Sequence, residues 1–81
     1  MENPDKTVAR LIDQWCARRA LGPLRYALQG WPPHNALTDG VADLVDALEK
    51  TRAFAREALT AEEESALDGA ISQLRGALRN R

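Results

Sequence analysis

The fold of this chain is decided by residues 60–78, which read TAEEESALDGAISQLRGAL. Thr60 is a residue type that caps the first free amide groups of a helix, and Glu63 can hydrogen-bond back to the amide of the cap residue. The large apolar residues that follow recur at spacings of four, three and four, so a helix places them on one face. They are Leu67, Ile71, Leu74 and Leu78. The stretch therefore predicts an amphipathic helix over about residues 61–79.

The N-terminal part repeats this pattern with a break. A helix over about residues 5–20 is predicted, with Asn3 and Pro4 suited to its cap and first turn. Its apolar face is formed by Val8, Leu11, Ile12 and Trp15. The pair Gly22-Pro23 then stops or kinks the helix near Ala20, because proline lacks an amide proton and its ring clashes with the preceding turn.

Two further helices are predicted after this break. A short one spans about residues 23–29 and carries an apolar face of Leu24, Ala27, Leu28 and Trp31, with Gly30 as its terminator. A long one spans about residues 39–58 after the Pro32-Pro33 segment, with Thr38 or Asn35 as its cap. Its buried stripe is Val41, Leu44, Val45, Leu48, Ala55 and Leu59, with Phe54 at the edge.

The connection at Leu59-Thr60 is very short, and such tight connections join antiparallel neighbours. The last two helices are therefore expected to form an antiparallel hairpin, with the first helix and its broken extension across the open face. Alternating strand patterns are missing. The prediction is an all-α protein, a small helical bundle in which residues 1–81 form a single domain.

The length of 81 residues makes stability marginal, because a chain this short buries roughly 60–65% of its unfolded surface. Cys16 is the only cysteine, so no disulfide forms within the chain. Stability must then come from well-packed helices or from association with a second copy, which makes a homodimer one option.

Composition gives an expected location. No apolar run approaches the roughly 18–20 residues that span a bilayer, and the N-terminal residues lack the basic and apolar segments of a secretory signal. We expect a cytoplasmic protein, and the single thiol agrees with this. Arginine, alanine and leucine are abundant, with only Lys6 and Lys50 as lysines, which suggests a bacterial source.

Most charge runs follow the helix dipole, with acids at helix starts and bases at helix ends. The cluster Arg18, Arg19 and Arg25 is explained only in part by this rule. It either stabilises the fold or binds a partner. The net charge of −1 argues against a nucleic-acid binder, which usually has a clear basic excess. Arg19 and Arg52 project from apolar faces, and either pair with acids such as Asp13 or Asp43 or meet a partner.

Catalytic and metal-binding groupings are not recognisable. His34 is the only histidine, and nothing in the sequence brings it to Cys16. The consecutive acids Glu62, Glu63 and Glu64 point about 100° apart on a helix and do not converge on one ion. Phosphate-binding glycine motifs and a nucleophile elbow are absent from the sequence. No enzyme activity, cofactor or metal is therefore expected.

Two features exceed what a minimal core needs. The last predicted helix carries a stripe of small residues around Gly69, Gln73 and Gly76, which either is tolerated at the surface or allows close approach of another helix. The second feature is Tyr26 with Trp31 beside the prolines, where Trp31 either closes the end of the core or is an exposed contact residue.

The expected function is a non-enzymatic helical protein-interaction module, such as an adaptor, a small chaperone or an inhibitor-like regulator. Its candidate contact residues are Arg18, Arg19, Arg25, Tyr26, Trp31, Gly69, Gln73 and Gly76. The alternative is a nucleic-acid-associated regulator that uses the arginine cluster. Salt dependence separates the two, because phosphate binding weakens steeply as ionic strength rises.

Overall fold

The computed structural model describes residues 3–31 and 38–79. In these two segments the chain forms helices α1 (Pro4–Ala17), α2 (Leu21–Ala27), α3 (Thr38–Phe54) and α4 (Ala61–Arg79), with a short 3₁₀ helix η1 (Arg56–Ala58) before α4. No strand occurs in the described residues. The predicted all-α class and the small helical bundle are confirmed.

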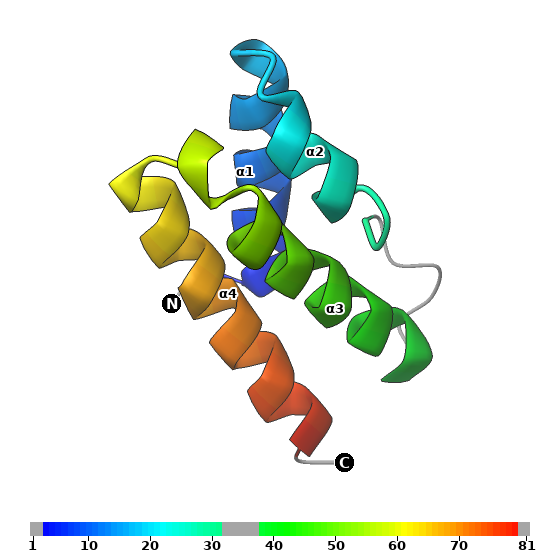
Figure 1. Ribbon diagram of the computed structural model, residues 1–81. Coiled ribbons are helices and arrows are strands. Elements are labelled where there is room, and N and C mark those ends of the chain that lie inside the picture. Colours follow the sequence, from blue (N-terminus) through cyan, green and yellow to red (C-terminus); the bar gives the residue numbers. More distant parts are fainter. Residues whose placement is uncertain (1–2, 32–37, 80–81) are drawn as a thin grey trace.

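The four α-helices form a closed ring in which each helix packs against two neighbours. Helix α2 lies between α1 and α3, and α4 lies between the same two helices on the other side (Figure 1). Helices α3 and α4 are neighbours and run in opposite directions (Figure 1). Because α2 and α4 lie diagonally across the ring, their outer faces belong to opposite sides of the molecule.

The core fills the middle of this ring with apolar side chains from all four helices. Trp15, Leu48 and Leu67 are completely buried at its centre. The indole Nε1–H of Trp15 has no hydrogen-bond acceptor within the described residues. The full cluster is Val8, Leu11, Ile12, Trp15, Leu24, Ala27, Leu44, Val45, Leu48, Leu67, Ala70, Ile71 and Leu74. The helical spacing of apolar residues predicted most of these positions.

Two of the helix starts that the sequence marks are capped as expected. Asn3 Oδ1 accepts a hydrogen bond from the Asp5 amide at 2.9 Å, and Pro4 is the first residue of α1. At α4, Thr60 Oγ1 accepts from the Glu63 amide, and Glu63 Oε1 accepts from the Thr60 amide, each at 3.1 Å. The capping box at Thr60 is therefore confirmed.

The first helix ends at Ala17, earlier than the predicted end near Ala20. Arg19 has a φ of 54°, which is the left-handed conformation that closes many helices. The Ala20 amide donates to the Trp15 carbonyl at 2.8 Å, and the Arg19 amide donates to the Cys16 carbonyl at 3.2 Å. This Schellman motif makes the break a true helix end, and α2 begins at Leu21 in place of the predicted Pro23.

The third helix also ends early, at Phe54, where the sequence predicts about residue 58. Residues 56–58 instead wind into η1, whose tighter turns are closed by the Ala58 amide donating to Ala55 and the Leu59 amide donating to Arg56. Leu59 is extended and leads to the cap of α4. Of the two predicted caps of α3, Asn35 lies outside the described residues, and Thr38 is described only by its backbone, as the first residue of α3. The diproline segment and His34 also lie outside the described residues.

One apolar side chain departs from its predicted inner face, and Phe54, predicted at the edge of the α3 stripe, is exposed. Leu28, predicted on the inner face of α2, is 51% exposed, and Phe54 at the end of α3 is 69% exposed. Leu28 follows the last residue of α2 and lies on the same helical face as Leu21, which is 72% exposed. The short helix buries only Pro23, Leu24 and Ala27. Trp31, Val41, Leu59 and Leu78 are partly buried against the core.

Candidate interaction surface

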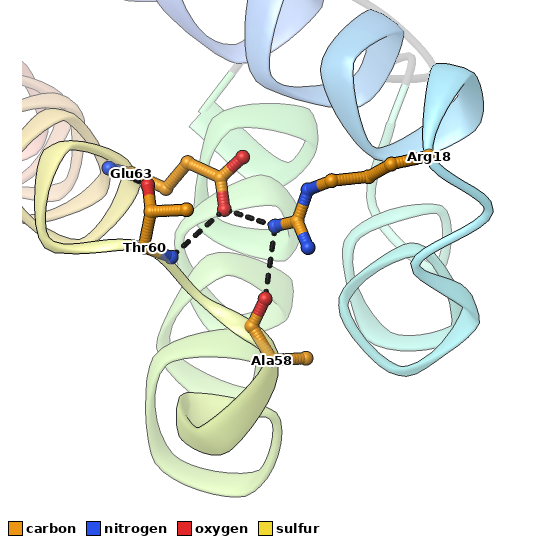
Figure 2. Close-up of polar contacts among 4 residues, drawn as sticks. All are labelled: Arg18, Ala58, Thr60 and Glu63. Atoms are coloured by element: carbon orange, nitrogen blue, oxygen red, sulfur yellow. Dashed lines mark hydrogen bonds and ion pairs between the residues drawn. The ribbon is translucent and has the colours of Figure 1, made fainter.

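Arg18 belongs to the fold and is not a free basic side chain. It is the residue after α1, and its Nη2 contacts Glu63 Oε1 in an ion pair and donates to the Ala58 carbonyl at 2.9 Å (Figure 2). The side chain of Glu63 is only 6% exposed, and it also completes the capping box with Thr60. One guanidinium therefore joins the end of α1, the end of η1 and the start of α4.

The other two arginines of the predicted cluster are placed differently. Arg19 and Arg25 are exposed, and in the described part of the chain neither forms an ion pair. The guanidinium carbon of Arg25 lies 6.0 Å from the centre of the Tyr26 ring, within the range of a cation–π contact. Arg19 does not lie on an α1 face beside Trp15, as its sequence position suggested, because the helix has already ended.

The ring of Tyr26 in turn contacts Phe54 at the end of α3, with 5.6 Å between ring centres. Leu21 and Leu28 lie four residues before and three residues after Arg25, which is the spacing of neighbours on one helix face. Leu21, Arg25 and Leu28 thus share one face of α2, the Arg25–Tyr26 and Tyr26–Phe54 contacts extend this surface to the end of α3, and the exposed Arg19 lies just before α2 in the chain. We call these six residues the α2 patch: Arg19, Leu21, Arg25, Tyr26, Leu28 and Phe54.

The α2 patch contains every large apolar side chain that is exposed in the described residues, namely Leu21, Leu28 and Phe54. Single exposed apolar residues are common, but their gathering on one surface is typical of contact sites. From the sequence alone, Arg19, Arg25 and Tyr26 are candidate contact residues, and the three apolar members are not among them. The spacing of seven residues between Leu21 and Leu28 indicates that they share a helix face. The sequence did not assign that face to the surface, because Leu28 also fits the predicted apolar face of the short helix with Leu24.

The small-residue stripe of α4 lies on the other side of the ring. Gly69 and Gln73 line a shallow depression of about 260 Å³ between α1 and α4, together with Thr7, Arg10, Ala66 and Ala70. Apart from the adjacent residues and the nearby backbone of α4 itself, no atom lies within 4 Å of where a Cβ at Gly69 or Gly76 would be. The structure therefore does not bring these residues together with Arg25, Tyr26 and Trp31. Trp31 is half-buried and packs against the core.

A second hollow, of about 360 Å³, lies between α3 and α4 and is lined by three arginines. Each is matched by a carboxylate: Arg52 contacts both Glu64 and Asp68 at 2.9 Å, Arg56 lies 3.6 Å from Glu64, and Arg75 pairs with Glu49. Arg52 thus pairs with acids of α4 and not with the predicted Asp13 or Asp43. The charges in this groove balance one another and join α3 to α4.

Reactive groups are spread over the described part of the molecule. Cys16 is a free, exposed thiol on α1, and no three His, Cys, Asp or Glu side chains gather there in a way that could hold a metal ion. None of the described helices combines the length and the apolar character needed to cross a membrane. Comparisons with protein-family models, curated proteins and solved structures gave no match to this chain.

Proposed function

We propose that this protein is a non-enzymatic helical interaction module, and that the α2 patch is its contact surface. The observation that carries the proposal is that Leu21, Leu28 and Phe54, the large apolar side chains exposed in the described residues, all lie on or beside α2. Burying them against a partner would remove apolar area from water at about 25 cal/mol per Å². The aromatic and arginine residues beside them are the types that most often dominate binding energy.

The role of the module follows from its size. A single small helical domain with one contact surface suits an adaptor, a small chaperone or an inhibitor-like regulator. Its composition and single cysteine are the basis for placing it in a bacterial cytoplasm.

The test is affinity capture from the native host with three versions of the chain, followed by mass spectrometry. The versions are the wild type, the patch variant Leu21→Ser/Leu28→Ser/Phe54→Ser, and the control Ala77→Ser/Ser72→Ala, which changes exposed positions of α4. We expect a partner to be retained by the wild type and the control and lost by the patch variant. Equal capture by all three would reject the α2 patch as the contact surface.

Light scattering of the purified chain accompanies this test, because a second copy is also able to cover the patch. A mass of two chains that returns to one in the patch variant would identify the partner as the protein itself.

A further inference from the structure

The α2 patch carries two positive charges that are not paired with carboxylates of the described residues, as is also true of Lys6 and Arg79 elsewhere on the described surface. Five other basic side chains have carboxylate partners, namely Arg18, Lys50, Arg52, Arg56 and Arg75. Arg19 and Arg25 have none within the described segments, and the patch itself contains no acid.

The elements that pack against α2 do not neutralise it. Their exposed acids include Asp13 on α1, Asp43 and Asp46 on α3, and Glu57 on η1. Asp46 pairs with Lys50 at 3.2 Å, and none of the four pairs with Arg19 or Arg25. An occupant of the patch therefore gains by bringing negative charge of its own.

The apolar members restrict the occupant further. A nucleic-acid backbone would neutralise the arginines but would leave Leu21 and Leu28 in water, since phosphates offer them no apolar contact. An amphipathic helix satisfies both requirements, because apolar residues three, four and seven apart can cover the leucines and Phe54 while acids on their flanks reach the arginines.

Resting on the proposed function, we propose that the α2 patch binds an acidic amphipathic helix of a partner protein. The helix lies along α2, its apolar residues contact Leu21, Leu28 and Phe54, and its carboxylates pair with Arg19 and Arg25.

The experiment is selection from a displayed library of random 16-residue peptides against the full chain. We expect the selected peptides to be rich in Asp and Glu, with Leu, Ile or Phe at helical spacing. For a selected peptide, Arg19→Glu/Arg25→Glu and Leu21→Ser/Leu28→Ser should each weaken binding by at least about tenfold, as measured by calorimetry. The control is Lys6→Glu/Arg79→Glu, which changes the net charge by the same amount at positions of α1 and α4 outside the patch. It should leave the peptide affinity within about twofold of the wild-type value.

A second arm tests the pairing itself. Replacing the peptide's acids by Gln should weaken binding to the wild type but not further weaken binding to Arg19→Glu/Arg25→Glu, since the interaction is then already lost. Circular dichroism of each variant confirms that it is folded, so a loss of affinity reports on the surface.

The possible outcomes distinguish a failure of this inference from a failure of the proposed function. Peptides without acidic enrichment that still need Leu21 and Leu28 overturn the acidic partner and leave the interaction module standing. An absence of binders, or binders insensitive to both double variants, overturns both. A single-stranded 20-nucleotide DNA or RNA that binds the wild type and is lost on charge reversal, with no selected peptide, assigns the patch to nucleic acid and also overturns the inference.

Discussion

At the scale of single residues, Arg19 has a backbone conformation that side chains other than glycine rarely adopt. It is the only described residue, glycines included, with a positive φ, at 54°. Side chains other than glycine lose about 1–2 kcal/mol in this conformation because Cβ approaches the following carbonyl oxygen. The Schellman position that Arg19 occupies is usually glycine. The chain thus has arginine at a position where the backbone conformation favours glycine.

Replacing Arg19 by glycine should therefore stabilise the protein. We expect the free energy of unfolding to rise by about 0.5–1 kcal/mol, since glycine adopts the left-handed region without strain. Urea unfolding followed by circular dichroism measures it. Arg19→Ala is the control, because it removes the same charge but keeps the strain, and it should give no gain. An equal gain from both would show that charge, and not backbone strain, is responsible.

The glycines give a second contrast at this scale. A Cβ on Gly30 would lie 2.6 Å from the Asp43 carbonyl oxygen and 2.9 Å from Ala47 Cβ, so α2's end and α3 approach closely at this point. Gly69 has open space around it in the middle of α4.

We expect Gly30→Ala to destabilise the protein by about 1–3 kcal/mol through overpacking. Gly69→Ala should stabilise it by about 0.5–1 kcal/mol, because alanine favours a helix interior. Thermal unfolding measures both. A stabilising Gly30→Ala would mean that α2 and α3 do not meet as described.

At the scale of elements, the contacts of Arg18 with Ala58 and Glu63 join the ends of three helices (Figure 2). These residues do not belong to the hydrophobic core. The carboxylate of Glu63 is nearly buried, so it depends on Arg18 and the Thr60 amide to replace its water. This arrangement explains why η1 can turn so sharply into α4: the Ala58 carbonyl that the turn leaves open accepts from Arg18.

Removing either partner should be costly. We expect Glu63→Ala to destabilise by about 2–3 kcal/mol, through loss of both the cap and the ion pair, and Arg18→Ala by about 1–2 kcal/mol, because it leaves the nearly buried Glu63 carboxylate without its cation. The double variant should cost less than the sum, with a coupling of about 1 kcal/mol or more by urea unfolding. Additive losses would indicate that the two side chains do not interact.

At the scale of the whole molecule, stability rests on one shared core inside the ring of helices. A chain of 81 residues that folds around one core is expected to have a free energy of unfolding of about 4–12 kcal/mol, by the usual value per residue. Loss of one central side chain is therefore a large fraction of the total, and no helix holds a core of its own.

Two leucines test this directly. Leu48 is fully buried, and Leu48→Ala should cost about 2–5 kcal/mol and lower the melting temperature by about 10 °C or more in a single transition. Leu28→Ala makes the same chemical change at a half-exposed position and should cost less than about 0.5 kcal/mol. Similar losses at both positions would contradict the burial pattern that defines the α2 patch.

The amino-acid sequence determined the class of fold, the caps at Asn3 and Thr60, and most of the core, because these depend on local spacing and on side chains within a few residues of one another. It also indicated that Arg19, Arg25 and Tyr26 form part of a contact surface, which stays a prediction.

Only the tertiary structure decided which charges are internal and which apolar residues face water. Arg18 meets Glu63 across 45 positions of sequence, and Leu28 is exposed because the two neighbours of α2 cover only its Pro23, Leu24 and Ala27 side. Helical periodicity predicts which residues share a face of a helix. How much of that face stays exposed to water depends on where helices distant in sequence pack against it. That is why the α2 patch could not be defined from the sequence.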